Sequence, residues 1–318
     1  MKILVTGAVG AVGSHVALAL KKSGHEVIGL DAFTDYYDVA IKEITASDLK
    51  RASIDIIRKN LAHDDISSDL EGVEIVYHFA AQPGISASTP FQNYLENNII
   101  ATQKLLEAVV RSSTLKLFVH ISTSSIYGAR ADSDETAEPK PTSVYGVTKL
   151  AAEQLALAYA RDKGLPVTVL RLFSVYGERE RPEKLYHKVI QNVLNDEPFT
   201  LYEGSEKHVR SYTHVSDIVD ACLLVLEKIE KVRGEIFNIG TDKTMTTGEG
   251  LAIIEELLGK KIIKNVVPKR AGDQLETSAK IDKARKILGY DPKIMPKEGL
   301  RRQIDWYKEK LHKRLNKR

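Results

Sequence analysis

Hydrophobic and polar positions in the first half of the chain alternate between two kinds of segment. Short runs that are apolar almost throughout, such as "KILVT" and "EVIGLD", begin near residues 2, 26, 74, 115 and 167. Amphipathic stretches with helical spacing lie between them and cover residues 14–24, 90–113 and 143–164. Strands without a polar face, separated by helices, are typical of a parallel sheet that helices cover on both sides. This pattern predicts an α/β fold with a doubly wound parallel sheet.

The third amphipathic stretch has clear end signals, because Ser143 can cap its N-terminus and Gly164 can end it. After about residue 175 the elements become shorter and turns more frequent, without an internal repeat or a low-complexity linker. We therefore expect a main domain at residues 1–173, to which a segment near 212–240 returns. A smaller C-terminal α/β lobe is expected to consist mainly of residues 174–318.

Three glycines lie where the first predicted strand meets the first helix, in "VTGAVGAVGSH". Gly7, Gly10 and Gly13 permit a tight turn and the close approach of a pyrophosphate to a helix N-terminus. The alternative is that these glycines only let the helix pack closely on the sheet. Asp31 ends the next predicted strand, where a carboxylate can bind ribose hydroxyls and repels a 2′-phosphate. A Rossmann-type domain that binds NAD rather than NADP is therefore predicted.

The composition narrows the class of protein further. The chain has 318 residues, of which 43% are hydrophobic and 28% charged, as in ordinary globular proteins. A net charge of +3 is too small to indicate nucleic-acid binding. Cys222 is the single cysteine, which excludes an internal disulfide and any cysteine-based zinc site. No apolar run approaches 18 residues, so we expect no signal peptide, no membrane span and a cytoplasmic location.

A tyrosine and a lysine stand four residues apart in "SVYGVTK". Such pairs are common on helices, so Tyr145 and Lys149 alone are equally consistent with an ordinary helix start. The fourth predicted strand, however, ends in "ISTSSIYG", which brings the hydroxyl of Thr123 to the edge of the sheet where ligands bind. An ammonium ~6 Å from the phenol would contribute roughly 2.8 kcal/mol at an effective dielectric near 20, or about two pKa units. On this estimate the pKa of Tyr145 falls towards about 8, and the phenol becomes a proton-transfer group.

Nine motifs occur in the order and spacing of one known family. They are "TGAVGAVGSH", "YHFAAQ", "ENNIIAT", "STSSIYG", "YGVTK", "RLFSVYG", "VRSYTHVSD", "FNIGT" and "KRAGD". On these motifs the chain resembles the extended short-chain dehydrogenase/reductases of the nucleotide-sugar epimerase/dehydratase type. The resemblance implies a bound NAD that is recycled, with Tyr145 as the base, Lys149 on the nicotinamide ribose and Thr123 on the reacting oxygen.

The same resemblance assigns the remaining site residues. Those implied to contact or support NAD are Gly7, Gly10, Ala11, Val12, Gly13, Asp31, Asn60, Leu61, Phe79, Ala80, Ala81 and Asn98. Those implied to contact a nucleotide sugar are Thr123, Ser124, Ser125, Ser174, Arg181, Arg210, Arg270 and Asp273, with the last three at the nucleotide end. Two arginines suit a diphosphate because their planar forks donate in pairs. No metal is implied.

The family's reactions share a 4-keto sugar and then diverge. Dehydratases resemble one another in carrying Asp-Glu after the catalytic threonine, whereas this chain has Ser124 and Ser125. Serine cannot act as the acid and base that eliminate water. A 4-epimerase is therefore the predicted activity. A 4-ketoreductase and, as the least favoured alternative, a dinucleotide-binding interaction protein without turnover stay open.

The segment "RLFSVYGERERPEKL" resembles the uronate 4-epimerases, which implies that Ser174 and Arg181 contact a sugar carboxylate. UDP-glucuronate and UDP-galacturonate are therefore the expected substrates. The alternatives are UDP-glucose, a UDP-N-acetylhexosamine, which the small Thr277 would not exclude, and a dTDP-sugar, with Arg181 as a surface cation. The chain departs from the family at Glu178 and Ala271, where proline is usual, and at Ala32, where asparagine is common. Residues 39–59 match poorly and have no assigned role.

A homodimer is expected on the same resemblance. In the family, helices corresponding to residues 92–112 and 143–163 pair across a two-fold axis. Small residues on the second helix would permit this close approach, namely Ala151, Ala152, Ala156 and Ala158. Burial of these alanines within one subunit explains them equally well.

Overall fold

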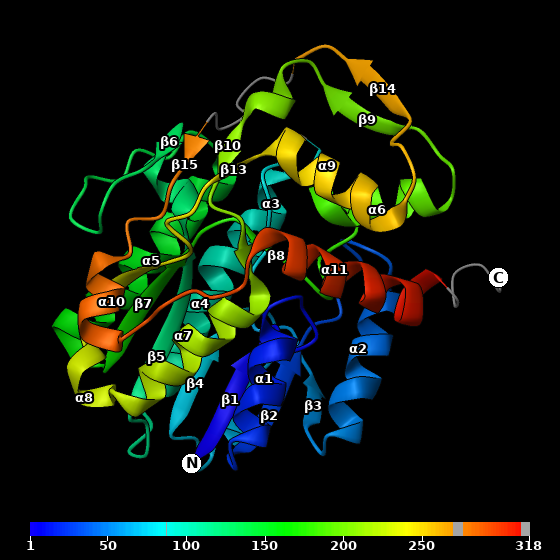
Figure 1. Ribbon diagram of the computed structural model, residues 1–318. Helices are drawn as coiled ribbons and strands as arrows, with labels where there is room; N and C mark the ends of the chain where they lie inside the picture. The colour runs from blue at the N-terminus through cyan, green and yellow to red at the C-terminus, as the bar shows by residue number, and fades with distance from the viewer. Residues whose placement is uncertain (87, 270–275, 313–318) are drawn as a thin grey trace.

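The computed structural model describes residues 1–86, 88–269 and 276–312, and its centre is a seven-stranded parallel sheet (Figure 1). The strand order is β12-β7-β5-β4-β1-β2-β3. Their bounds are β1 Lys2–Thr6, β2 Glu26–Asp31, β3 Asp55–Arg58, β4 Ile75–His78, β5 Leu117–Thr123, β7 Val167–Leu172 and β12 Ile236–Ile239. All neighbouring pairs are parallel. The order reverses at β1, and in open α/β sheets the expected place for a ligand is beyond the carboxyl ends of the strands at such a point, here β1 and β4.

Helices cover both faces of this sheet, as the apolar strands require. One face packs against α1 (Gly13–Lys22), α2 (Val39–Arg51), α7 (Val215–Glu227) and α10 (Asp282–Leu288). The other packs against α4 (Ala101–Val109) and α5 (Val144–Lys163). The short α8 (Ile229–Val232) follows α7. The predicted α/β fold with a doubly wound parallel sheet is confirmed.

A smaller lobe with a hydrophobic core of its own lies beyond the carboxyl edge of the sheet, at the top of Figure 1. Its helices are α6 (Leu185–Leu194), α9 (Thr247–Leu258) and α11 (Pro296–Trp306). Strands β9 (Phe199–Tyr202) and β14 (Lys264–Val267) pair with each other, as do β8 (Val175–Tyr176) and β11 (Thr213–His214). A four-stranded sheet has the order β13-β10-β15-β6, in which the bounds are Met245–Thr246, Val209–Arg210, Glu276–Thr277 and Arg130–Ala131.

The two long helical stretches differ in regularity. Helix α5 begins and ends as predicted, because the Ser143 hydroxyl accepts a hydrogen bond from the Gly146 amide and Gly164 is left-handed with φ +68°. The stretch predicted at residues 90–113 is divided into α3 (Phe91–Tyr94), a π-helical segment (Leu95–Ile100) and α4. Wider turns of this kind are frequent at functional sites. Among the described residues, no helix is both long enough and apolar enough to cross a membrane.

Candidate active site

The glycine-rich loop between β1 and α1 has a shape that its glycines dictate. Gly7 has φ +66°, and a Cβ there would lie 2.7 Å from the Ala80 amide nitrogen. A Cβ at Gly13 would lie 2.4 Å from the Gly7 carbonyl oxygen. The N-cap of α1, Val12, supplies no side-chain hydrogen bond, so the first amides of the helix keep their capacity to donate, apart from the Ser14 amide, which donates to the Gly10 carbonyl oxygen at 3.2 Å. This arrangement fits a pyrophosphate, which needs close backbone approach and free amides at a helix N-terminus. Gly10, Ala11 and Val12 all belong to this loop.

Asp31 lies at the carboxyl end of β2, beside this loop. Its carboxylate accepts hydrogen bonds from the amides of Val9 at 3.1 Å and Phe33 at 2.9 Å. Burial raises the pKa of Asp31, while the Phe33 amide and the positive charge of Lys42 offset part of the rise. A carboxylate has about four acceptor sites, so two remain for ribose hydroxyls.

The next two strands end beside Asp31 and the glycine loop. Asn60 follows β3 and accepts a hydrogen bond from the Ala62 amide at 2.9 Å, and Leu61 is buried. After β4, the half-buried Phe79, Ala80 and Ala81 run past Gly7. Phe79, Ala80 and Ala81 thus lie at the carboxyl end of β4, where the strand order reverses, and Asn60 and Leu61 lie at the carboxyl end of the edge strand β3.

Asn98 ties the segment after β4 to helix α5. It lies in the π-helical turn, is 1% exposed, and accepts a hydrogen bond from the Gln82 amide at 2.7 Å. Its amide nitrogen donates to the Thr148 hydroxyl at 3.0 Å. Asn98 therefore acts on the site through the backbone that it holds.

Thr123 and Tyr145 meet where β5 ends and α5 begins. The Thr123 hydroxyl accepts from the Ser125 amide at 3.2 Å and donates to the Ser125 hydroxyl at 3.3 Å. A Cβ at Gly146 would lie 2.7 Å from the Ser125 carbonyl oxygen. Only glycine at position 146 therefore lets the first turn of α5 approach this closely, with Tyr145 beside Thr123.

Lys149 lies one turn further along α5 and is 4% exposed. Its ammonium donates to the Ile121 carbonyl oxygen at 2.6 Å. Burial lowers the pKa of Lys149 to about 8, and the negative charge of Glu153 opposes the shift. The cost of burying this charge is thus large.

The sequence-based estimate for the pKa of Tyr145 is wrong in its direction. Burial raises the pKa of this phenol, and the Thr123 hydroxyl and the positive charge of Arg181 offset only part of the rise. The estimate assumed that attraction to Lys149 dominates. In the structure, burial of the phenol is the larger effect.

The loop after β8 is held at three successive residues. The Glu178 carboxylate lies 3.1 Å from Nε2 of the buried His214, and the Glu178 carbonyl oxygen lies 3.0 Å from His15 Nε2 on α1. Arg179, with φ +60°, forms an ion pair with Asp48 on α2 at 3.0 Å. Residues 39–59, which the sequence left without a role, therefore brace this loop through α2.

Glu180 holds the other end of the same loop. Its buried carboxylate accepts from the His187 amide, in the first turn of α6, at 3.0 Å and from the Gln303 side chain at 2.7 Å. Burial raises the pKa of Glu180. Glu178, Arg179 and Glu180 are held by contacts to the main domain and to the smaller lobe. The position of Arg181, the next residue, therefore depends on both.

Arg181 is brought close to Tyr145 by two residues that sequence reasoning missed. A Cβ at Gly84 would lie 3.7 Å from both terminal nitrogens of Arg181. The Gly84 carbonyl oxygen accepts from the Tyr94 hydroxyl at 2.8 Å, and the rings of Tyr94 and Tyr145 are 6.4 Å apart. The guanidinium also lies 5.9 Å from the ring of Tyr36. Arg181 is thus a cation of the Tyr145 site, not a solvated surface cation.

The remaining predicted substrate residues lie around this centre or outside the described residues. Ser124 is buried and Ser125 half-buried in the turn after Thr123. Ser174 lies just after β7, and its carbonyl oxygen accepts from the Thr213 amide at 3.0 Å. Arg210 lies half-buried in β10 and interacts electrostatically with Lys184. Arg270 and Asp273 lie outside the described residues, as does Ala271.

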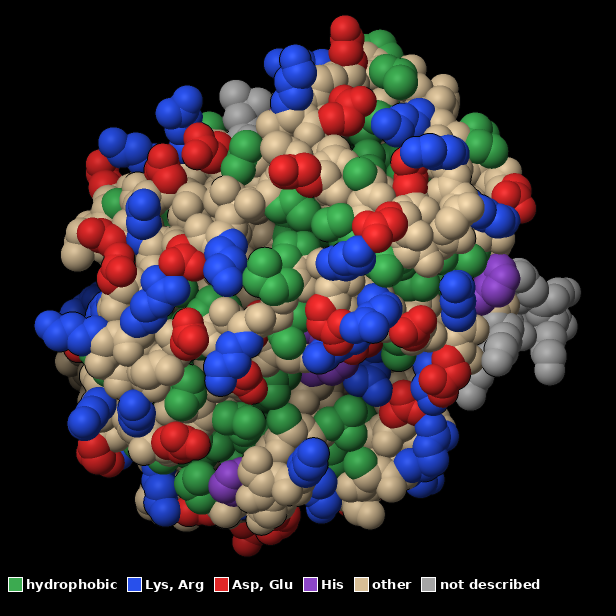
Figure 2. Space-filling model, viewed as in Figure 1, with side chains coloured by type: hydrophobic (Ala, Val, Ile, Leu, Met, Phe, Trp, Pro, Cys, Tyr) green, Lys and Arg blue, Asp and Glu red, His purple; other side chains and the backbone are tan. Residues whose placement is uncertain are grey.

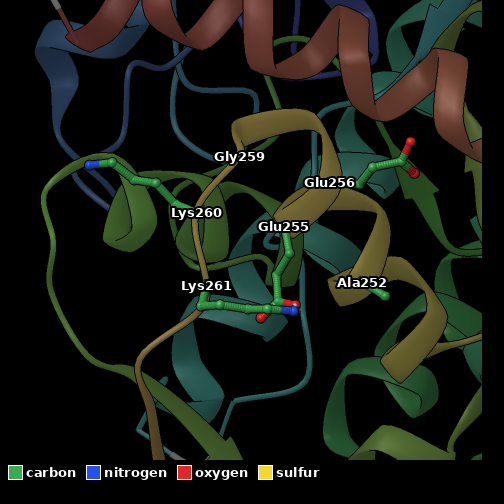
Figure 3. Close-up of a pocket in the computed structure, with 6 residues that line it drawn as sticks. All are labelled: Ala252, Glu255, Glu256, Gly259, Lys260 and Lys261. Carbon is green, nitrogen blue, oxygen red and sulfur yellow. The ribbon is translucent and has the colours of Figure 1, made fainter.

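Two further surface features do not belong to this site. A hollow of about 270 Å³ is lined by Ala252, Glu255, Glu256, Gly259, Lys260 and Lys261, none of which is a predicted site residue (Figure 3). Its Glu255 and Lys261 form an ion pair at 2.7 Å. On the described part of the face drawn in Figure 2, positive and negative side chains are interspersed.

Sequence reasoning missed Gly84, Tyr94 and the pairing of Glu178 with His214. The departure from proline at Glu178 was a signal for the last of these. Tyr94 and Gly84 carry no local signal, because they reach the site only through the packing of the loop after β4 on α5.

The chain is clearly similar to known proteins. The profile of the NAD dependent epimerase/dehydratase family matches residues 3–240, and the chain belongs to that family. "Uncharacterized UDP-glucose epimerase YtcB" of Bacillus subtilis (strain 168) is 38% identical, over 96% of this chain and 97% of its own length. "UDP-glucuronate 4-epimerase 1" of Arabidopsis thaliana is 35% identical, over 96% of this chain and 76% of its own length.

Among solved structures, a UDP-glucuronic acid 4-epimerase from Bacillus cereus, in complex with UDP-glucuronic acid and NAD, is similar over nearly the whole chain. It is 37% identical with a TM-score of 0.93 and covers 97% of this chain and 99% of that one. The prediction of an NAD-dependent member of the epimerase/dehydratase family is confirmed.

Proposed function

We propose that the protein is a nucleotide-sugar 4-epimerase that interconverts UDP-glucuronate and UDP-galacturonate, with a recycled NAD. Membership of the NAD dependent epimerase/dehydratase family supports the class of reaction. The similarity to proteins named UDP-glucuronate 4-epimerase supports the substrate. The sugar keeps its composition, because the hydrogen removed from C4 returns to the opposite face.

The residues at the carboxyl edge of the sheet fit NAD. The glycine loop carries no side chain where a pyrophosphate would approach, and the N-terminus of α1 has no side-chain cap. Asp31 would accept from the adenosine ribose, and Lys149 would donate to the nicotinamide ribose. The chemistry supplied by bound NAD is reversible hydride acceptance from C4 of the sugar.

The protein's own groups move the proton of the C4 hydroxyl. The phenolate form of Tyr145 accepts that proton as the 4-keto sugar forms, and the resulting phenol returns it when the hydroxyl is restored. Thr123 donates to the reacting oxygen and holds it beside Tyr145. Arg181 and Thr123 both favour the phenolate form of Tyr145. Ser124 and Ser125 supply no acid or base, so the 4-keto sugar can only take the hydride back.

The position of Arg181 carries the assignment of a uronate. Its guanidinium is linked to Tyr145 through Gly84 and Tyr94, and its side chain is 16% exposed. A sugar whose C4 hydroxyl reaches Tyr145 would have C5, and the carboxylate on it, next to the reacting carbon. A charge-assisted hydrogen bond to that carboxylate is worth about 1.5–3 kcal/mol.

Replacement of Arg181 by alanine tests this proposal. Arg181→Ala should lower kcat/KM for UDP-glucuronate by roughly 10- to 150-fold, because each 1.36 kcal/mol is a factor of ten. It should lower turnover of UDP-glucose far less, because that sugar has no carboxylate and loses only the support that Arg181 gives to the Tyr145 phenolate. Arg111→Ala, at an exposed arginine, is the matched control. NMR of the product sugars measures both reactions. Equal losses on the two substrates would show that Arg181 serves the fold or the diphosphate.

UDP-glucose is the second candidate, because the relative from Bacillus subtilis is named a UDP-glucose epimerase. Activity of the wild type on UDP-glucose or UDP-N-acetylglucosamine, with none on the uronate, would favour this alternative within the same class. Thr277 is fully buried in β15, so a limit on the C2 substituent is not expected from its side chain. A 4-ketoreductase would release its cofactor each cycle, whereas an epimerase should purify with NAD bound.

A homodimer is part of this proposal. Three apolar side chains on α3 and the first turn of α5 are strongly exposed, with Phe91 at 58%, Val144 at 48% and Val147 at 51%. These residues support pairing of the two helices with those of a second copy. Ala152 and Ala156 are fully buried within the subunit and cannot contribute to it. The cytoplasmic location, the division at residue 173/174 and the assigned contacts of Arg210, Arg270 and Asp273 stay predictions.

A further inference from the structure

A carboxylate of the protein itself lies against the arginine proposed to bind the sugar carboxylate. Glu183 Oε1 is 2.8 Å from the NH1 nitrogen of Arg181, and their side chains are 33% and 16% exposed. Both carboxylate oxygens of Glu183 are buried and accept no hydrogen bond of regular geometry among the described residues. Glu183 is therefore held by its charge rather than by directed hydrogen bonds.

Glu183 makes none of the contacts that anchor the loop. Glu178, Arg179 and Glu180 each hold a neighbouring element in place. Glu183 is the next acidic residue of the loop, and its only ion-pair partner among the described residues is Arg181. Removing its charge would therefore leave the three anchoring contacts of the loop unchanged.

A second cation, Lys184, lies next to Glu183. Lys184 follows Glu183 and is the N-cap residue of α6. It interacts electrostatically with Glu180, Arg181 and Glu183. A carboxylate that left Arg181 would still have a positive partner beside it.

We propose that Glu183 determines substrate selectivity by occupying Arg181 until a sugar carboxylate displaces it. This inference rests on the proposed function and adds a residue to it. With a uronate bound, two carboxylates compete for one guanidinium, and Glu183 turns towards Lys184. With a neutral hexose bound, Glu183 stays on Arg181 and prevents a half-buried unpaired cation, which would otherwise be unfavourable. The Glu183–Arg181 pair thereby reduces the difference in affinity between uronates and hexoses.

The substitution Glu183→Gln tests the proposal, with Glu197→Gln at an exposed glutamate as the control for net charge. The ratio of dissociation constants for UDP-glucose and UDP-glucuronate is measured by calorimetric titration of the NAD-loaded protein. We expect Glu183→Gln to shift this ratio towards the uronate by about 10-fold, which corresponds to about 1.4 kcal/mol. Glu197→Gln should leave it unchanged.

A double-mutant cycle separates this role from a general change of charge. In an Arg181→Gln background, the gain from Glu183→Gln should disappear, since no guanidinium is left to free. A ratio unchanged by Glu183→Gln, or a gain that persists without Arg181, would overturn the proposal. Because the titration needs no turnover, it reports on Glu183 even if the wild type fails to epimerise UDP-glucuronate. That failure, seen by NMR, would reject the proposed substrate instead.

Discussion

Replacing Lys149 by methionine should make the cofactor-free protein more stable while it removes activity. Burial lowers the pKa of Lys149 from 10.5 to about 8, and its side chain is 4% exposed. Each pKa unit corresponds to 1.36 kcal/mol, so the buried charge costs about 3 kcal/mol at pH 7. Methionine has a similar length and no charge. It also leaves the Ile121 carbonyl without its donor, which offsets about 1 kcal/mol. A net gain of about 2 kcal/mol in the free energy of unfolding follows.

The sign of the pH dependence is fixed by the direction of this shift. Below pH 8 the lysine holds its proton in both the folded and the unfolded protein, so the full cost is present. Between about 8 and 10.5 the folded protein releases the proton first, and the cost declines. The advantage of Lys149→Met should therefore be largest at neutral pH and shrink as the pH rises towards 10.5.

Urea unfolding of the wild type and of Lys149→Met, followed by circular dichroism at neutral and at alkaline pH, measures this difference. NAD must be removed first, since a ligand bound only to the folded state adds stability of its own. Other titrating groups cancel in the difference between the two proteins. A methionine variant that is no more stable than the wild type at neutral pH would refute the reasoning. So would an advantage that does not change with pH.

Two further predictions concern the cofactor and the proton transfer. Tyr145→Phe should keep its fold and its affinity for NAD, measured by calorimetry, but lose about 10²–10⁴ in turnover because the general base is gone. More than half of wild-type activity would reject that role. Cofactor-free protein should bind NAD more tightly than NADP, because the Asp31 carboxylate would face the 2′-phosphate with a like charge. Asp31→Asn should narrow the difference, and tighter binding of NADP by the wild type would contradict the role of Asp31.

Local chemistry made much of this protein predictable from its sequence. The parallel sheet follows from apolar strands that alternate with helices, and the ends of α5 follow from the capping preferences of Ser143 and Gly164. The shape of the glycine loop follows from the absence of side chains at Gly7 and Gly13. Each of these features depends on residues that are close together in the chain, so their types and spacing suffice.

Tertiary structure decided what happens between distant segments. Arg181 reaches Tyr145 through Gly84 and Tyr94, which lie about ninety residues earlier in the chain and have no local signal. The pairing of Glu183 with this arginine turns a loop carboxylate into a competitor for a ligand. The titration of Tyr145 was predicted wrongly because an attraction can be estimated from spacing, whereas burial depends on every segment packed around the phenol. The sequence thus determined the parallel sheet, the glycine loop and the ends of α5, and the packing of the two lobes determined which distant side chains meet.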